Sequence, residues 1–325
     1  MNIYYVLYEL EANQTLSATC AALKRQGALL KVCLTPDKIG YADCHPWTER
    51  GDLSLQQQLT HLAQGKLTPL TQYALKLATL DAEKRSQGKG IFLNQQIPLS
   101  HFLITNVFEW TPQHISHLIQ QGYTHVKLKV GRHPDREAEI LHSLFFHTPL
   151  QLRLDFNETL TPQTFRHFLQ GIQQLQHQID FIEDPFPFDS QEWTAIQKEG
   201  WILACDSQAS RACDQPEAAQ ILIVKPALQP CEEWQKWIHQ SRIVTSYLGH
   251  PLEQVAAAYV ASQIDPSCAS VHGLLSHHAY QPTLFSQRLS WQSPHFILPP
   301  GTGFGFDQEL EALHWIPLHK EVFDR

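Results

Sequence analysis

Several features that mark membrane, secreted or nucleic-acid-binding proteins are absent from this sequence. No run of about 18 apolar residues, the length that spans a membrane, occurs among its 325 residues. The start, MNIYYVLYELEAN, lacks a basic segment and turns acidic early, so we expect no signal peptide and a cytoplasmic protein. No more than two Lys or Arg residues follow one another and the net charge is −8, which argues against a nucleic-acid partner.

Motifs that bind metals through cysteine or histidine are also missing. The seven cysteines are an odd number and no two form a C-x-x-C pair, which favours scattered reduced thiols over disulfides. The 19 histidines include no H-x-x-x-H or H-E-x-x-H spacing. We therefore expect most histidines at the surface or in satisfied core positions.

The composition is that of a folded globular protein. Hydrophobic residues make up 43% of the chain and charged residues 17%, so a large core can form. The length suffices for one barrel of eight strands plus a small second domain.

Charged residues recur at the downstream ends of five short apolar runs, HVKLKVG, LRLDFN, DFIEDP, ILACDS and ILIVKP. From the second lysine onward they stand 26, 28, 23 and 19 residues apart. One strand-plus-helix unit of an eight-fold barrel takes about 25–30 residues, so successive barrel strands would each deliver one charge to the same rim. The residues are Lys127 with Lys129, then Asp155, Glu183, Asp206 and Lys225.

Strand alternation supports this arrangement, because successive side chains of a strand point to opposite faces. In VKLKV the two lysines share one face, and in LRLDFN Arg153, Asp155 and Asn157 share a face with apolar residues opposite. The polar faces would point into the barrel mouth. A lone Asp before a loop is usually a turn residue and a lone Lys a surface residue; the ordered set of five positions favours a site.

Three carboxylates between two lysine positions suit one kind of chemistry. Removing a proton next to a carboxylate creates an ene-diolate, whose two negative oxygens a hard cation such as Mg²⁺ can neutralise. A lysine near a metal and another cation loses proton affinity and becomes a usable base. The pattern therefore predicts a divalent-metal site with a base on either side.

The order of elements predicts an α/β protein with two parts. A strand at 3–10, a hairpin with its turn at Thr35–Gly40 and helices at Leu53–Ala63 and Pro69–Arg85 form an α+β cap over residues 1–98. A barrel follows over residues 99–295, and Phe296–Phe306 returns to the cap, which residues 296–325 complete. The predicted barrel strands are Leu103–Phe108, His125–Val130, Gln151–Asp155, Phe181–Glu183, Ile202–Asp206, Ile221–Lys225, Arg242–Thr245 and Ser270–Gly273. Among the helices we predict Thr161–Leu175, Ser190–Lys198 and Pro251–Ser262.

The motifs GYTHVKLKVG, LRLDFNETLTP, IDFIEDP, LACDSQ and IVKP resemble the enolase superfamily, and LRLDFNETLTP most resembles its o-succinylbenzoate synthase branch. The stretches LKRQGALLKVCL and GYADCHPW are similar to that branch's capping domain, and PPGTGFGFD is similar to its return strand. The resemblance covers nearly the whole chain and implies a modified TIM-type (β/α)7β barrel with a capping domain.

The resemblance also implies roles for the charged residues. Lys129, the second lysine of K-x-K, corresponds to the acid/base, and we expect Lys127 to lower its pKa. Lys225 corresponds to the lysine on the opposite face, which stabilises the intermediate as a cation. The metal ligands would be Asp155, Glu183 and Asp206. They would hold Mg²⁺, for which Mn²⁺ could substitute.

Other positions carry two interpretations each. Asn157 either supports the metal site or forms an Asx turn. Asp184 either helps to order the site or makes a turn before Pro185. Arg153 corresponds to a family arginine, with a structural role inside the barrel as the alternative.

One segment departs from the family, which shows paired serines and then a Glu at strand seven. Here TSYLGHP keeps Ser246 and has Gly249, His250 and Pro251 where the acid would stand. Substrate contacts on that side are therefore open, as they are for the cap loop at residues 12–22, which carries no motif.

The resemblance implies o-succinylbenzoate synthase activity, a syn-dehydration by a metal-dependent carbon–oxygen lyase acting on a small carboxylate. The substrate would be 2-succinyl-6-hydroxy-2,4-cyclohexadiene-1-carboxylate, and the pathway menaquinone biosynthesis. The same site could instead serve an N-acylamino acid racemase or a dipeptide epimerase. A Schiff-base aldolase would need one lysine and no ordered carboxylates, and a retired barrel that acts as a binding protein is the non-enzyme alternative.

Overall fold

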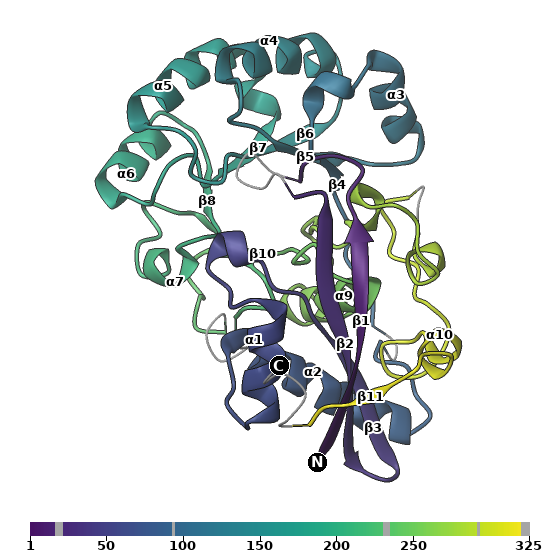
Figure 1. Ribbon diagram of the computed structural model, residues 1–325. Coiled ribbons are helices and arrows are strands. Elements are labelled where there is room, and N and C mark those ends of the chain that lie inside the picture. Colours follow the sequence, from purple (N-terminus) through teal and green to yellow (C-terminus); the bar gives the residue numbers. More distant parts are fainter. Residues whose placement is uncertain (17–21, 93–94, 230–234, 291–292, 320–325) are drawn as a thin grey trace.

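A seven-stranded parallel sheet forms the larger part of the protein. The computed structural model describes residues 1–16, 22–92, 95–229, 235–290 and 293–319 (Figure 1). Strands that follow one another in the chain lie side by side, in the order β10-β9-β8-β7-β6-β5-β4. The strands are β4 (Phe102–Ile104), β5 (His125–Lys129), β6 (Gln151–Asp155), β7 (Ile179–Glu183), β8 (Leu203–Cys205), β9 (Ile221–Val224) and β10 (Ser241–Val244).

The two edges of this sheet are linked through the segment predicted as the eighth strand, Ser270–Gly273. Parallel bridges join Ser100 to His272 and Thr245 to Gly273. The eighth position of the barrel is therefore held by two bridging residues instead of a full strand. The observed architecture confirms the predicted α/β class, with a curled parallel sheet and an antiparallel cap.

Helices form an arc outside the curled sheet, which Figure 1 shows from α3 to α7. They are α3 (Pro112–Gln120), α4 (Pro134–Phe145), α5 (Pro162–Gly171), α6 (Ser190–Lys198) and α7 (Ala209–Ala212), with α9 (Pro251–Ile264) between the sheet and the cap. Short 3₁₀ turns are η1 (Thr48–Arg50), η2 (Val107–Glu109), η3 (Gln173–Gln178), η4 (His277–Ala279) and η5 (Ser286–Arg288).

Three helices begin with the dipeptide Thr-Pro, which explains where they start. Thr68, Thr111 and Thr161 each precede a helix, and each side chain accepts a hydrogen bond from the backbone N–H three residues on. The following proline occupies the first helical position, where its missing N–H costs nothing. These caps place α2, α3 and α5 from local sequence alone.

Two barrel elements end four residues before their predicted last residue. The strand predicted over Leu103–Phe108 ends at Ile104, because the Asn106 side chain accepts a hydrogen bond from Phe108 N at 3.2 Å and turns the chain into η2. The helix predicted to reach Leu175 ends at Gly171 and continues as the 3₁₀ turn η3.

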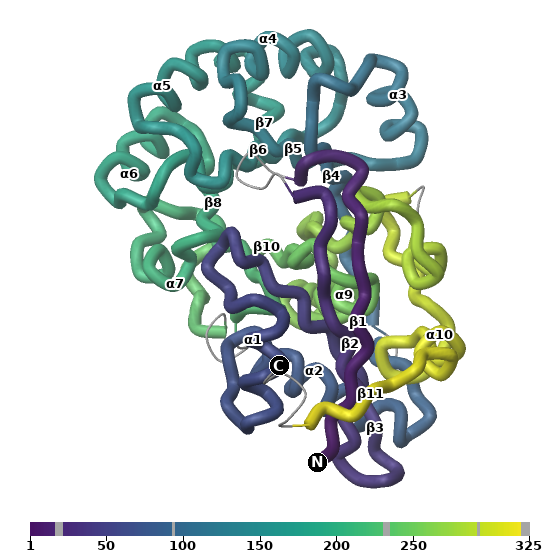
Figure 2. Tube along the Cα trace, viewed as in Figure 1, coloured from purple at the N-terminus to yellow at the C-terminus, as the bar shows by residue number. Residues whose placement is uncertain are grey.

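The cap combines a four-stranded antiparallel sheet of order β11-β1-β2-β3 with two helices. Its elements are β1 (Asn2–Glu11), β2 (Lys24–Thr35), β3 (Lys38–Cys44), α1 (Leu55–Ala63), α2 (Pro69–Ser86) and β11 (Ile316–Pro317). Strand β3 approaches α2 so closely that a Cβ on Gly40 would lie 1.8 Å from Ala78 O. The first and last strands of the chain are neighbours, as the trace in Figure 2 shows.

The prediction that PPGTGFGFD is the return strand is wrong. The strand that pairs with β1 is β11, and Gly301, Gly303 and Gly305 have φ of 126°, 54° and 83°, which a strand does not allow. This glycine loop instead wraps around a buried carboxylate of α2, where Phe304 N donates to Asp81 Oδ1 at 2.6 Å. A short helix, α10 (Asp307–Glu311), follows the loop.

Asp81 connects the glycine loop, β3 and α2, and its loss should destabilise the protein strongly. The fully buried carboxylate also accepts from Tyr41 N at 2.8 Å and pairs with Arg85 at 2.6 Å. We expect Asp81→Ala to lower the free energy of unfolding by about 3–5 kcal/mol, because it leaves two buried N–H groups without an acceptor and removes one of the two carboxylates that pair with Arg85. Urea denaturation measures this; the exposed Asp37→Ala should stay within about 0.5 kcal/mol of wild type. An equal effect of both changes would contradict the role of Asp81.

Candidate active site

The register of the parallel sheet brings three of the predicted residues into one row. Lys129 lies beside Asp155 on the neighbouring strand, and Asp155 lies beside Glu183 on the next. Asp206 follows β8 and Lys225 follows β9 at the same end of the sheet. All five side chains are buried.

Ion pairs connect the lysines to the carboxylates. Lys127 Nζ lies 2.5 Å from Glu183 Oε2 and 2.8 Å from Asp155 Oδ2, so it bridges two strands. Lys129 Nζ lies 2.6 Å from the same oxygen of Asp155. Lys225 Nζ pairs with Asp206 Oδ2.

A cap residue that sequence reasoning missed also reaches the site. Arg50, at the end of η1, places Nη1 3.2 Å from Asp206 Oδ2. Its loop is attached to the barrel, since Trp47 Nε1 donates to Tyr247 O at 2.9 Å and Tyr247 Oη donates to Asp52 Oδ2 at 3.0 Å. No motif in the cap indicated this residue, because its partner lies far away in the sequence.

Burial and neighbouring charges separate the pKa values of these groups. Burial lowers the pKa of Lys129 to about 8, with Lys127 and Arg50 acting in the same direction and Asp155 opposing. The charge of Lys127 thus lowers the pKa of Lys129, as predicted. Burial, then the charge of Asp155, raises the pKa of Glu183 to about 8. Burial opposes ionisation of Asp206, but Lys225 and Arg50 lower its pKa to about 2.

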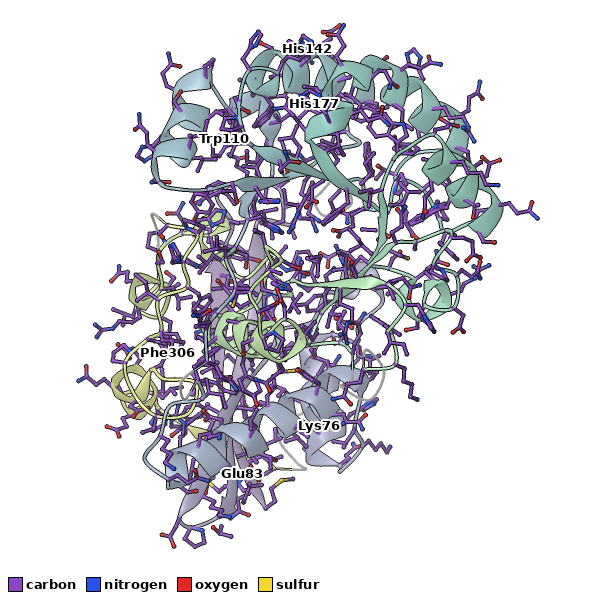
Figure 3. The ribbon with its side chains drawn as sticks, turned by 180° about the vertical axis from the view of Figure 1, so that it is seen from behind. Lys76, Glu83, Trp110, His142, His177 and Phe306 are labelled. Atoms are coloured by element: carbon purple, nitrogen blue, oxygen red, sulfur yellow. The ribbon has the colours of Figure 1, made fainter. Side chains whose placement is uncertain are left out.

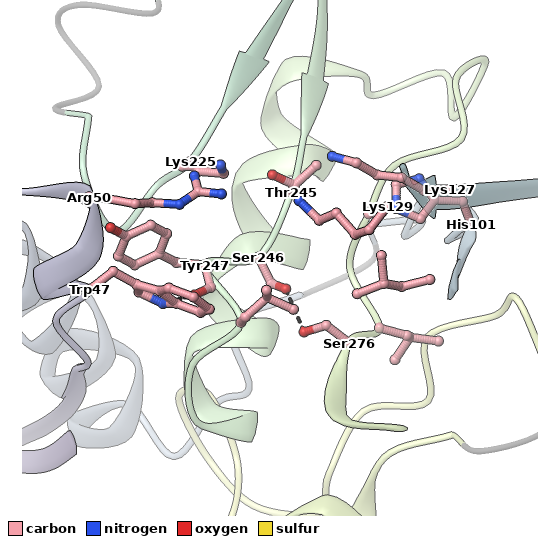
Figure 4. Close-up of a pocket in the computed structure, with 14 residues that line it drawn as sticks. Trp47, Arg50, His101, Lys127, Lys129, Lys225, Thr245, Ser246, Tyr247 and Ser276 are labelled. Carbon is pink, nitrogen blue, oxygen red and sulfur yellow. Dashed lines mark hydrogen bonds between the residues drawn. The ribbon is translucent and has the colours of Figure 1, made fainter. Parts of the chain in front are cut away.

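The lysines face a pocket of about 480 Å³ between the barrel mouth and the cap. In Figure 4, Arg50 and Lys225 lie at one side of this pocket and Lys127 and Lys129 at the other. The rest of the lining is apolar or bears hydroxyl groups and an imidazole: Trp47, His101, Leu103, Thr245, Ser246, Tyr247, Leu248, Gly273, Leu275 and Ser276. Four cationic side chains and no lining carboxylate among the described residues suit an anionic, partly apolar ligand.

A metal would have to compete with the ammonium groups for the carboxylates. As the side chains stand, no three His, Cys, Asp or Glu groups in the described part of the chain are placed to hold a metal ion. The donor set nonetheless fits Mg²⁺, because it offers three carboxylates and because the buried Glu183 Oε1 has no hydrogen-bond partner.

Two neighbours of the carboxylates organise the strand ends. Asn157 Oδ1 accepts from Lys129 Nζ at 3.2 Å, which holds the proposed base beside Asp155. Asp184 has a φ of 43° and accepts from Asp206 N at 3.0 Å and Ser207 N at 2.9 Å. Through these two bonds Asp184 orders the loop that carries Asp206. This agrees with the first of its two interpretations, that it helps to order the site.

Arg153 lies deeper in the barrel, apart from the pocket lining. Its Nε donates to Asp180 Oδ2 at 2.7 Å, its Nη1 contacts His101 Nδ1 at 3.0 Å, and its guanidinium lies 4.7 Å from the centre of the Phe181 ring. These contacts describe a structural role, with His101 as its link to the pocket.

The atypical strand-seven segment is held by groups that the sequence did not reveal. Ser246 lines the pocket and its Oγ lies 2.7 Å from Ser276 Oγ. His250 is the N-cap of α9, where its Nδ1 accepts from Leu252 N. The buried Glu253, in the first turn of α9, accepts from Tyr247 N at 3.0 Å. Glu253 thus binds the loop backbone and is not among the described residues that line the pocket.

An aromatic cluster on the opposite face fixes the strand ends. The Phe156 ring lies 5.0 Å from Phe168 and 5.7 Å from Phe165, and Phe186 continues the cluster to Trp193. Because Phe156 follows Asp155 directly, this packing holds the backbone that carries the carboxylate.

Histidines take no part in the carboxylate cluster. In Figure 3, His142 and His177 lie on the outer layer of the barrel, on α4 and η3. Of the 19, only His101 lines the pocket in the described residues.

Comparison with known proteins agrees with this geometry. Residues 3–84 match the model of the o-succinylbenzoate synthase N-terminal domain, and residues 112–224 match the enolase C-terminal domain-like model. An o-succinylbenzoate synthase of Bdellovibrio bacteriovorus is 35% identical over 98% of this chain and 99% of its own length. The chain belongs to the o-succinylbenzoate synthase family of the enolase superfamily. Members of this family are lyases, and the chain is accordingly an enzyme.

Solved structures of the enolase superfamily share the fold at low sequence identity. The L-Ala-D/L-Glu epimerase of Bacillus subtilis has a TM-score of 0.78 at 13% identity, covering 94% of this chain and 98% of its own. The N-succinyl Arg/Lys racemase of Bacillus cereus has a TM-score of 0.74 at 18% identity, covering 94% and 95%. A search of the described helices finds none long and apolar enough to cross a membrane.

Glu253 should make stability depend on pH. Burial raises its pKa to about 8, so the native protein keeps a proton that the unfolded chain releases above the ordinary glutamic acid pKa. Its stabilising contribution is therefore complete at low pH and is lost as pH rises toward 8, by about 1.4 kcal/mol per pH unit.

We expect Glu253→Gln to gain stability relative to wild type between pH 5 and pH 8 in urea denaturation, because the amide has no proton to lose. The exposed Glu139→Gln on α4 should show no such trend. A difference between Glu253→Gln and wild type that is the same at both pH values would refute the prediction.

Proposed function

We propose that this protein is an o-succinylbenzoate synthase. It would convert 2-succinyl-6-hydroxy-2,4-cyclohexadiene-1-carboxylate to o-succinylbenzoate and water, a step of menaquinone biosynthesis in the cytoplasm. The observation that carries the proposal is the full-length similarity to the Bdellovibrio enzyme of that name. The cationic pocket supports it, because the substrate is a small dicarboxylate with an apolar ring.

Asp155, Glu183 and Asp206 would hold a Mg²⁺ ion, or Mn²⁺ in its place. Once bound, such an ion supplies electrostatic stabilisation of the negative charge that develops on the substrate's ring carboxylate. Three buried carboxylates on neighbouring strands and the unpartnered Glu183 Oε1 support this assignment.

Lys129 would act first as base and then as acid. Its lowered pKa, about 8, makes the neutral amine accessible near neutral pH, so it can take the proton next to the ring carboxylate. The same group then gives that proton to the departing hydroxyl, which leaves as water while the ring becomes aromatic. Asn157 and Asp155 hold the amine in place through both steps.

Lys225 would stabilise charge from the other side of the pocket. It lies opposite Lys129 in Figure 4 and is buried beside Asp206. As a cation it favours the ene-diolate form of the substrate without transferring a proton. Lys127 bridges Asp155 and Glu183 and tunes its neighbour, Lys129.

The second candidate is racemisation of N-acylamino acids or epimerisation of dipeptides. Lysines on opposite sides of one pocket permit it, since racemisation needs a base on each face of the α-carbon. The two reactions therefore differ in what they require of Lys225.

Metal dependence follows from the repulsion among three buried carboxylates. We expect EDTA to abolish turnover of the diene and Mg²⁺ or Mn²⁺ to restore it. Glu183→Gln and Asp206→Asn should each be inactive in the same assay. Full turnover in excess chelator would contradict the metal site.

The two lysines should respond differently to substitution. One general acid–base step is typically worth ~10²–10⁴-fold in kcat. Lys129→Ala should lose more than this, because the same residue serves in two proton transfers. Lys225→Arg keeps a cation and should retain measurable dehydration, whereas Lys225→Ala should lose about 3–4 kcal/mol of transition-state stabilisation. Equal losses in Lys225→Arg and Lys225→Ala would indicate proton transfer by Lys225.

Substrate preference tests the proposed reaction directly. We expect kcat/KM for the cyclohexadiene precursor to exceed kcat/KM for N-succinylamino acids on one preparation in Mg²⁺. The full-length similarity to a synthase favours this result. A higher value for racemisation would overturn the reaction and leave the fold and the site unchanged.

A further inference from the structure

Arg50 stands where two pockets of opposite charge meet. It lines the cationic pocket with the lysines and also a second, larger pocket of about 1220 Å³, as does Tyr247. The second pocket is acidic, with Glu49, Asp52, Glu158, Asp184 and Asp206 in its lining. The guanidinium therefore lies between a pocket lined by cations and a pocket lined by carboxylates, one of which is the proposed metal ligand Asp206.

Arg50 pairs with Asp206, which is also a proposed ligand of the metal. Its guanidinium donates a hydrogen bond to Asp206 Oδ2, the oxygen that also pairs with Lys225. An oxygen that ligates a divalent cation cannot keep two other cations at the same distances without strong repulsion. Arg50 would then need another anionic partner.

The charge of the loaded site indicates what that partner is. The pocket is lined by Arg50, Lys127, Lys129 and Lys225 and by no carboxylate among the described residues, and a bound divalent cation would add further positive charge. A dicarboxylate substrate offsets this excess of positive charge. In the proposed function the ring carboxylate lies next to the metal and Lys225. The succinyl carboxylate would therefore be the one that Arg50 binds.

The loop that carries Arg50 is attached to the barrel by hydrogen bonds on both sides of it, from Trp47 to Tyr247 O and from Tyr247 Oη to Asp52. Trp47 is fixed by its bond to Tyr247 O, and its ring lies under both Arg25, at 3.5 Å, and Arg50, at 5.7 Å.

We propose that Arg50 exchanges Asp206 for the succinyl carboxylate of the substrate when the metal binds. The assignment rests on the proposed function for the identity of the ligand. It makes Arg50 a specificity-determining residue supplied by the cap, and it links metal binding to recognition of the second carboxylate.

Opposite changes in two affinities test the exchange. Arg50→Gln removes a competitor for Asp206, so Mg²⁺ without ligand should bind about three- to tenfold more tightly in calorimetry. The same variant, saturated with Mg²⁺, should bind o-succinylbenzoate roughly 10- to 100-fold more weakly. Arg50→Lys keeps the charge and should lie nearer wild type for the metal, and Lys38→Gln, an exposed cap lysine, should change neither affinity. A merely structural role would weaken both, and unchanged or weaker Mg²⁺ binding by Arg50→Gln overturns the proposal.

A second ligand identifies which carboxylate Arg50 holds. 2-Butanoylbenzoate keeps the ring carboxylate and the ketone of o-succinylbenzoate and lacks the distal carboxylate. Wild type should prefer the dicarboxylate, and Arg50→Gln should lose most of that preference. An equal loss of both ligands, or no preference in wild type, overturns the assignment.

The two proposals can fail separately, because these are binding measurements. Ligand discrimination through Arg50 without turnover of the diene would overturn the synthase reaction alone. Turnover of the diene with no change in discrimination by Arg50→Gln would overturn the role of Arg50 alone.

Discussion

The structure depends on one electrostatic constraint, the burial of like charges at adjacent strand ends. Parallel register sets Asp155 directly beside Glu183, and both are out of contact with water. Buried carboxylates need cations or hydrogen-bond donors, and for these two Lys127 meets the need by bridging them. The same close spacing of negative charges would favour binding of a divalent cation. One arrangement of carboxylates therefore explains both why the cluster needs cations and why we propose a metal there.

The rest of the barrel holds these charges at fixed positions. Phe156 is packed into an aromatic cluster on the outer face, which immobilises the strand that bears Asp155. Asp184, in a left-handed conformation, holds the loop of Asp206 through two backbone N–H groups. These contacts fix the strand ends that bear the carboxylates, and the cap reaches the same cluster through Arg50, which pairs with Asp206.

Most of the barrel could be predicted because its signals are local. Strand alternation and the Thr-Pro caps located the elements, and the spacing of Lys129, Asp155 and Glu183 set their order along the rim. The prediction for PPGTGFGFD was wrong because the glycines permit backbone angles that only the contact with Asp81 selects. Neither Arg50 nor Glu253 could be assigned a contact, since each bonds to a segment that is distant in sequence or reached by a loop.

The sequence by itself determined the fold class and the order in which charges arrive at the barrel mouth, since both depend on periodicity within about 30 residues. Its motifs carried the resemblance to the family. Tertiary structure decided which charges touch. Lys127 bridges two carboxylates while Lys129 contacts one, although they stand two positions apart on the same face. It also decided that the cap supplies Arg50. Such distinctions depend on strand register and on how the cap meets the barrel, and no local pattern encodes either.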